Sequence, residues 1–134
     1  MLRAPLAAAA AAFTIIVLGA VASEGAENEA GGDPTKGAVA FVRQCALCHT
    51  VEKGGPNRFG PNLFGITERK AGTAPGFAYS PAFKSVADWT WSESGVGSFI
   101  AAPGAAIPGN KMAIFQGVSD RDGADIVAFL ATQK

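Results

Sequence analysis

The sequence predicts an all-α protein with a single folded domain. Its 134 residues suit one domain better than two. Three segments carry helix signals, and no segment alternates apolar and polar residues as a half-buried strand would. Residues 50–79 are rich in Gly and Pro and follow neither the helical nor the strand period. We therefore expect a few short helices joined by one long irregular segment.

The first helix is expected to begin at Pro34 and to run into Cys45. Asp is a residue type that caps helix N-termini, and Asp33 stands directly before a Pro, which is favoured at the first helical position. The apolar run from Val39 to Val42 follows at once. Together these signals predict a helix of about ten residues, close to the usual length in globular proteins.

Two further helices are predicted in the C-terminal half. Ser92 is suited to cap a helix that runs to Ala102 and is ended by Pro103, although two internal glycines each weaken it by about 1 kcal/mol relative to Ala. Ser119 and Asp122 resemble a capping pair, and the apolar residues after them give the last helix an amphipathic pattern.

Residues 1–22 have the composition of an export leader. A positive start at Arg3 precedes an apolar run, and Ala20 and Ala22 are small residues at the two positions that a signal peptidase checks. We expect a signal peptide cleaved after Ala22. The alternative is an uncleaved membrane anchor, because the nineteen residues 4–22 lie at the edge of a membrane-spanning length. In both cases the rest of the chain is delivered outside the cytoplasmic membrane, to the periplasm of a bacterium.

Residues 23–33 are acidic and Gly-rich and are expected to form a flexible linker, which leaves 34–134 as the folded domain. That domain has ten basic and seven acidic residues, a net charge of +3. The whole chain has 11 of each, so its net charge is zero. A nucleic-acid binder would show a clustered basic excess, and none is present in the sequence.

The long irregular segment 50–79 implies a missing component. Loops of this length are uncommon in a domain of this size, and three short helices do not cover them. Something large and apolar that is not protein must fill the middle of the domain.

The motif Cys45-Ala-Leu-Cys48-His49 predicts that component. In the spacing C-x-x-C-H, two thiols lie one helical turn apart, where each can add to a vinyl group of one porphyrin, and the following His can ligate the iron. Three other interpretations exist: a thioredoxin-like dithiol, which lacks its strand–helix alternation here, half of a zinc site, which lacks further Cys or His ligands, and an inert disulfide. The haem interpretation also explains the long loop.

Met112 is the candidate for the sixth iron ligand. His49 is the single His in the chain, and the second Met is Met1, which leaves with the leader. A lone Met usually packs in the core. Here it lies in the turn-rich segment 107–112, and no other ligand exists, so both arguments favour iron ligation. A thioether opposite an imidazole stabilises ferrous iron and closes both axial sites, which is the arrangement of electron carriers.

These motifs resemble the class I cytochromes c of the mitochondrial and bacterial cytochrome c2 type, over nearly all of residues 34–134. The segments that carry the resemblance are Gly37 and Phe41, 45–51 (CALCHTV), 60–63 (GPNL), 76–80 (GFAYS), Trp91, 107–112 (IPGNKM) and 124–130 (ADIVAFL). The resemblance implies three to five short helices wrapped around one covalent haem c. It also implies a cofactor site made of Cys45, Cys48, His49 and Met112, in which His49 and Met112 bind the iron.

The resemblance further implies specific contacts. In such a fold the Pro61 carbonyl accepts the Nδ1–H of His49, which fixes the tautomer of the ligand. Tyr79 and Trp91 would reach the haem propionates, or else they belong to the aromatic core. The resemblance also implies that the first helix packs on the last helix, through Gly37 and Phe41 on the first and Ile126 and Phe129 on the last.

Two departures from the family pattern are visible. Phe99 stands where a tyrosine is usual near the Met sulfur, so we expect an altered reduction potential or Met–iron bond. Docking lysines are also few. Gln44, Ala105 and Ala106 occupy positions where lysines are common, while Arg58 and Lys111 remain. We expect the reaction with redox partners to depend weakly on ionic strength.

The expected function is that of a soluble, monomeric one-electron carrier, not an enzyme. Its partners would be redox proteins: a cytochrome bc1-type complex or a dehydrogenase as donor, and an oxidase or a photosynthetic reaction centre as acceptor. Two alternatives stay open. One is a membrane-tethered electron-transfer subunit of a larger complex. The other is a haem peroxidase or gas-binding protein, which would need an open axial site.

Overall fold

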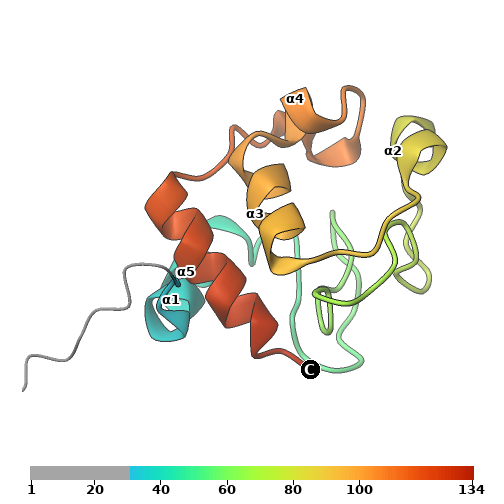
Figure 1. Cartoon of the computed structure of the whole chain (residues 1–134). Coiled ribbons are helices and arrows are strands. Elements are labelled where there is room, and N and C mark those ends of the chain that lie inside the picture. The colour runs from blue at the N-terminus through green and yellow to red at the C-terminus, as the bar shows by residue number, and fades with distance from the viewer. Residues whose placement is uncertain (1–30) are drawn as a thin grey trace, which may run out of the picture.

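The computed structural model describes residues 31–134. The predicted leader 1–22 and most of the predicted linker lie outside the described residues. The described part contains five α-helices and one 3-10 turn, which are α1 (Pro34–Gln44), α2 (Pro81–Val86), α3 (Glu93–Ala101), α4 (Pro103–Ala106), η1 (Lys111–Ile114) and α5 (Asp120–Ala131) (Figure 1). Within residues 31–134 the β-structure is limited to one isolated bridge between Lys70 and Thr90. The all-α prediction is confirmed.

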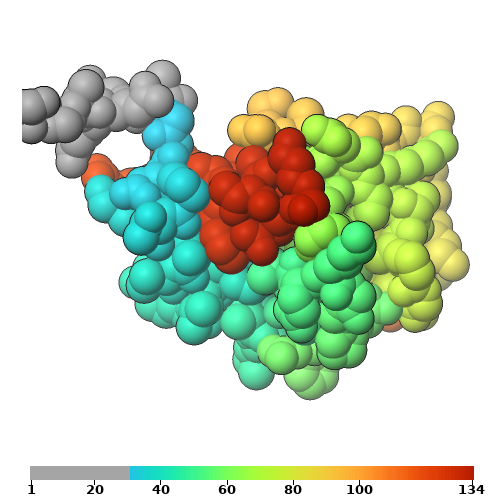
Figure 2. Space-filling model, turned by 90° about the horizontal axis from the view of Figure 1, so that it is seen from below, coloured from blue at the N-terminus to red at the C-terminus, as the bar shows by residue number. Residues whose placement is uncertain are grey.

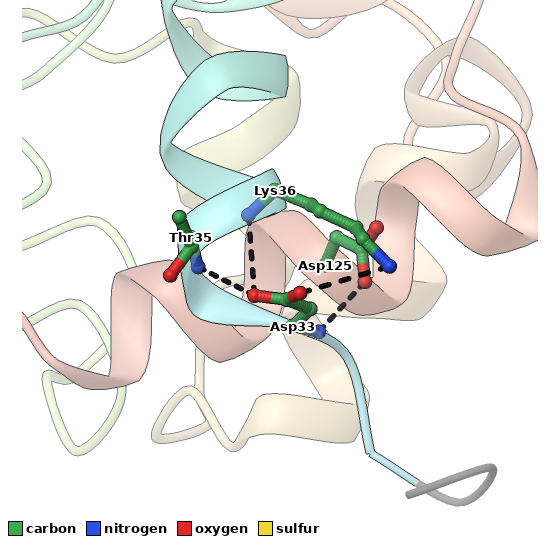
Figure 3. Close-up of polar contacts among 4 residues, drawn as sticks. All are labelled: Asp33, Thr35, Lys36 and Asp125. Atoms are coloured by element: carbon green, nitrogen blue, oxygen red, sulfur yellow. Dashed lines mark hydrogen bonds and ion pairs between the residues drawn. The ribbon is translucent and has the colours of Figure 1, made fainter. Parts of the chain in front are cut away.

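Helix α1 begins and ends where the sequence predicts. The Asp33 carboxylate accepts hydrogen bonds from the backbone amides of Thr35 and Lys36, and Pro34 occupies the first turn (Figure 3). Cys45 is the C-terminal cap. The last turn of the helix therefore leads directly into the segment that carries both cysteines.

Helices α1 and α5 pack closely because Gly37 has no side chain. A Cβ at Gly37 would lie 1.9 Å from the Asp125 carbonyl oxygen, so another residue type would force the two helices apart. One turn later the rings of Phe41 and Phe129 are in contact in a tilted arrangement, with their centroids 5.5 Å apart. Ile126, which is 1% exposed, joins Phe41 in the same core. The predicted packing of the first helix on the last is confirmed.

The far end of α5 meets the long loop. The backbone amide of Gly65 donates to the Gln133 carbonyl at 2.6 Å. In Figure 2, the red of α5 lies between the cyan of α1 and the green of this loop. The loop is thereby attached to the helical part of the domain.

The caps of α3 and α5 are confirmed, whereas the role of Pro103 differs from the prediction. The Ser92 side chain accepts from the Gly95 amide, and the Ser119 side chain accepts from the Asp122 amide. Pro103 does follow the end of α3, which is broken at Ala102, but it also opens α4. The reason is that its fixed φ suits the first turn of a new helix.

Helix α2 was not predicted. The Ser80 side chain caps it by accepting from the Phe83 amide, and Pro81 stands in its first turn. This is the same Asp/Ser–Pro signal that predicts α1. Its six residues are too few to show a helical period.

The segment between α1 and α2 has no regular helix or strand, as predicted. Side chains replace the missing ladder of hydrogen bonds. Arg69 donates to the carbonyls of Asn62 and Phe64, at 2.9 and 3.3 Å. Thr50 donates to the Pro56 carbonyl at 2.8 Å. These hydrogen bonds hold the loop in one conformation, and the loop forms part of the wall of an internal cavity.

Candidate cofactor site

The helices and the long loop enclose a cavity of about 1200 Å³, part of which opens to solvent. Its wall is mostly apolar and includes Phe41, Leu63, Ile126 and Leu130. An apolar cavity of this kind is typical of the sites that hold small molecules and cofactors. It agrees with the inference that something large and apolar fills the middle of the domain.

All four residues predicted to hold the cofactor line this cavity: Cys45, Cys48, His49 and Met112. The first three follow α1, and the fourth lies in η1. Residues far apart in the sequence are therefore brought to one cavity.

A tight turn after α1 presents the two cysteines. The amides of Cys48 and His49 both donate to the Cys45 carbonyl, at 3.0 and 2.9 Å. Neither cysteine forms a disulfide. Burial, with a smaller contribution from Cys48, raises the pKa of the Cys45 thiol to about 11. Both thiols are therefore free to form bonds to a group in the cavity.

The His49 ring is held in one orientation by the chain that crosses it. Its Nδ1 lies 2.8 Å from the Pro61 carbonyl oxygen, as predicted. A carbonyl oxygen only accepts, so Nδ1 carries the proton and Nε2 keeps a free lone pair. Burial lowers the pKa of His49 and so favours this neutral form, although the Pro61 hydrogen bond acts in the opposite direction.

Gly60 allows that close crossing. A Cβ at this position would lie 2.2 Å from Cε1 of His49. Any other residue would push the 60–61 segment away from the ring and lose the hydrogen bond to Pro61. The glycine thus serves the orientation of the imidazole.

Met112 is placed by Asn110, which the sequence analysis missed. The Asn110 side-chain oxygen accepts from the Met112 amide at 2.6 Å, and its amide nitrogen donates to the carbonyls of Pro103 and Ile107. Asn110 is buried, and three hydrogen bonds fix it. Met112 therefore lies in a short 3-10 helix, whereas the sequence analysis placed it only in a turn-rich segment. An Asn at the position before a helical turn is the signal that was available.

Arg69 is a second residue that the sequence analysis missed. It is the cation of the long loop that lines the cavity, and its guanidinium is held by the carbonyls of Asn62 and Phe64. Burial lowers the pKa of Arg69, yet an arginine stays charged at neutral pH. It places a fixed positive charge beside the otherwise apolar wall, where a carboxylate of a bound group would be stabilised.

Aromatic rings cover one side of the cavity. Four of them, Tyr79, Phe83, Trp91 and Phe99, line the cavity. Together with Trp89, which does not line it, they form a continuous chain of ring contacts with centroids 5.1 to 6.2 Å apart. The Tyr79 hydroxyl accepts from the Ala74 amide at 3.2 Å. Tyr79 and Trp91 both line the cavity, and their contact with haem propionates stays a prediction.

The donor set fits an iron porphyrin. An imidazole with a free Nε2, a thioether and two free thiols share one apolar cavity that has a cation in its wall. Among residues 31–134, no group of three or more His, Cys, Asp and Glu is placed to hold a metal ion by itself. The part of the chain described also has no helix long and apolar enough to cross a membrane. These features define a class: helical proteins that enclose a covalently attached haem.

Comparison with known proteins gives the same answer. The model of the cytochrome c family matches residues 34–134. Cytochrome c of Chlamydomonas reinhardtii is 45% identical over 100 residues, which cover 74% of this chain and 88% of the relative. Cytochrome c2 of Rhodomicrobium vannielii is 40% identical over 123 residues, which cover 91% of this chain and 96% of the relative. Cytochrome c of Ulva intestinalis is 44% identical over 101 residues, which cover 74% of this chain and 88% of the relative.

The chain belongs to the cytochrome c family. It binds one covalently attached haem c, and Cys45 and Cys48 fit the attachment motif of the family. It is a c-type cytochrome that carries electrons.

Proposed function

We propose that this protein is a periplasmic one-electron shuttle with an iron that keeps both axial ligands in both oxidation states. One observation carries the proposal: Pro61 fixes His49 with its Nε2 lone pair free, in the cavity that Met112 also lines. In this assignment Cys45 and Cys48 would hold the porphyrin covalently, and His49 and Met112 would bind the iron.

The chain's own residues explain why such a site would transfer electrons and do little else. The bound haem supplies a reversible Fe(III)/Fe(II) couple. Pro61 and Asn110 hold His49 and Met112 in place, so few atoms need to move when the charge of the site changes. If His49 and Met112 both bind the iron, they would leave no site for peroxide or a gas. The apolar wall excludes water, which favours the less charged, reduced state. The protein is thus a carrier and not an enzyme.

The periplasmic location follows from the leader predicted at residues 1–22. The similarity to the bacterial cytochrome c2 supports it, because that match covers 91% of this chain and therefore extends beyond residues 34–134. The donor would be a bc1-type complex or a dehydrogenase, and the acceptor an oxidase or a photosynthetic reaction centre. Retention of the leader would make the protein a membrane-tethered carrier instead.

The test is to produce the full chain in a bacterium that has a cytochrome c maturation system. Mass spectrometry should find one haem added to a chain that starts at Ser23; a chain that still carries residues 1–22 would indicate the tethered form. The oxidised protein should be low-spin, with the weak near-infrared band of sulfur-to-iron charge transfer. Rapid carbon monoxide binding to the reduced protein would overturn the proposed ligation by Met112 and favour a gas-binding or peroxidase function.

A further inference from the structure

A second pocket lies between α2 and the helices α3 and α4. Within residues 31–134, α1 contacts α5, α3 contacts α4 and α5, and α4 contacts η1, whereas α2 makes no close contact with another helix. Figure 1 shows α2 apart from the other helices. The second pocket occupies the space beside it and has a volume of about 990 Å³, which includes its open mouth.

The second pocket shares a wall with the cofactor cavity. Trp91 and Phe99 line both spaces, and their rings are in contact with centroids 5.4 Å apart. Trp89 lines only the second pocket, and the edge of one indole meets the other at 5.2 Å between the Trp89 and Trp91 centroids. A molecule in the second pocket would therefore be separated from the bound haem by a layer of aromatic rings.

Small side chains keep the second pocket open. Five of its lining residues are Ala, Gly or Ser: Ala82, Ser85, Gly95, Ser98 and Ala106. A Cβ at Gly109 would lie 3.3 Å from Cβ of Ala82, so the chain after α4 closely approaches the first turn of α2. The other end of α2 is uncovered, since Val86 lines the pocket and is 51% exposed.

The lining favours an uncharged aromatic ligand. It contains no Asp, Glu, Lys, Arg or His. The rings of Trp89, Trp91 and Phe99 suit an aromatic ring, which can stack on them or meet them edge to face. The Ser85 hydroxyl donates to the Ala82 carbonyl at 2.9 Å, so its oxygen is left to accept from a donor group. An aromatic ring that carries a hydroxyl group matches both features.

We propose that the second pocket binds a small uncharged phenol and that the bound phenol raises the reduction potential of the haem. Apolar pockets with a few placed polar groups are the usual sites of small ligands. A ring in this pocket would displace water from the outer side of Trp91 and Phe99. The surroundings of the haem then become less polar, which favours the less charged ferrous state. Because binding and reduction are linked, the reduced protein should bind the phenol more tightly by the same factor.

Isothermal titration calorimetry of the holoprotein with p-cresol tests this proposal, in the ferric state and in the ascorbate-reduced state. Toluene-4-sulfonate has a similar ring but carries a charge, so it serves as the control ligand. Ala106→Leu fills the pocket, and Ser85→Ala removes the hydroxyl acceptor. Ala105→Leu is the matched control, because Ala105 and Ala106 are both exposed residues of α4 and only Ala106 lines the pocket. The visible and near-infrared spectra of each variant report whether the haem site is intact.

We expect the wild type to bind p-cresol with a Kd of about 0.1–1 mM, which is reasonable for so small a ligand. The reduced form should bind about two- to fivefold more tightly than the oxidised form. Saturating p-cresol should then raise the reduction potential by about 20–40 mV, since a tenfold change corresponds to about 59 mV for one electron. Ala106→Leu should weaken binding at least about fivefold and Ser85→Ala about two- to tenfold, whereas Ala105→Leu should stay within a factor of about 1.5.

Three results would overturn the proposal. Absence of binding, or equal binding of p-cresol and toluene-4-sulfonate, would show that the pocket does not select an uncharged phenol. Wild-type affinity in both Ala106→Leu and Ser85→Ala would place the bound p-cresol elsewhere on the protein. Equal affinity of the two oxidation states would show that the wall of Trp91 and Phe99 does not couple the two spaces.

Discussion

The backbone amide of Asp33 donates a 2.7 Å hydrogen bond to Oδ1 of Asp125 (Figure 3). Asp125 lies in α5 and is only 9% exposed, so a buried carboxylate of the last helix holds the residue that caps the first. The α1–α5 contact therefore combines apolar packing with this hydrogen bond at the N-terminal start of the domain.

Replacing Asp125 with Ala should remove this hydrogen bond and weaken the contact between α1 and α5. The Asp33 amide would lose a charged acceptor in a partly buried place, and such bonds contribute about 1.5–3 kcal/mol. We expect the free energy of unfolding of the holoprotein to fall by about that amount in urea denaturation. The control is Asp88→Ala, since Asp88 makes an exposed ion pair with Lys70 at 3.2 Å. Exposed pairs contribute about 0–1 kcal/mol, so equal losses in both variants would contradict the role of Asp125.

The Asp33 cap predicts a pH dependence of stability. Hydrogen bonds from the backbone amides of Lys36 and Thr35 lower the pKa of Asp33 below its ordinary value of 3.8. A group with a lowered pKa in the folded state stabilises the fold above its unfolded pKa. That contribution should disappear as the pH falls from about 4 through the lowered value. Asp33→Asn keeps an acceptor but cannot titrate.

Thermal unfolding from pH 7 down to pH 2 checks this prediction. The melting temperature of the wild type should fall more steeply than that of Asp33→Asn below pH 4, and the two slopes should agree between pH 5 and 7. Identical slopes over the whole acid range would show that Asp33 does not contribute.

Local chemistry made much of this fold predictable. The caps Asp33, Ser92 and Ser119 were found because a capping side chain bonds to an amide two or three residues away. The same signal at Ser80 was overlooked, because α2 directly follows a Gly- and Pro-rich stretch and is too short to show a period. Pro103 was interpreted as an end of a helix although Pro also favours a start.

The candidate site also contains residues that could be predicted from the sequence and residues that could not. Cys45, Cys48 and His49 form a continuous motif, and Met112 followed by exclusion. Asn110 carried a local capping signal. Its bonds to Pro103 and Ile107 and the role of Arg69 could not be predicted, because these depend on how separate segments meet. Arg69, for example, is useful because Asn62 and Phe64 turn their carbonyls toward it and because the loop closes one wall of the cavity.

Gly37 sets the distance between α1 and α5, and Gly37→Ala should separate them. Its Cβ would lie 1.9 Å from the Asp125 carbonyl oxygen, which is backbone and cannot move aside cheaply. We expect a loss of about 1–3 kcal/mol in the free energy of unfolding, the usual result of overpacking. Gly97→Ala in α3 is the matched control, because its Cβ would meet Val127 at an ordinary 3.6 Å.

Gly97→Ala should stabilise the protein by about 0.5–1 kcal/mol, since Ala has the higher helix propensity. Opposite signs for the two variants in urea denaturation are therefore the expected result. Equal effects would mean that the close approach at Gly37 does not restrict the packing.

Phe99→Tyr should change the redox properties of the haem. Phe99 lines the cavity that Met112 lines, and its ring packs against those of Phe83 and Trp91. A hydroxyl there makes the surroundings more polar and stabilises the more charged ferric state. We expect the reduction potential to fall by about 20–60 mV, up to a tenfold change in the equilibrium constant. Phe129→Tyr, outside the cavity wall, should leave the potential unchanged. A redox titration in which Phe99→Tyr matches the wild type would dispose of this prediction.

Met112→Leu tests the proposed sulfur ligand directly. Leucine matches the apolar character and approximate size of methionine, so the fold around η1 should persist, but it has no lone pair for the iron. The oxidised variant should lose the near-infrared band, and its reduced form should bind carbon monoxide, whereas the reduced wild type should not. Ile114→Leu, at the other end of the same short helix, is the control and should behave like the wild type. If Met112→Leu kept the band and stayed closed to carbon monoxide, the iron would have another ligand, because a thioether that is absent cannot hold the axial site.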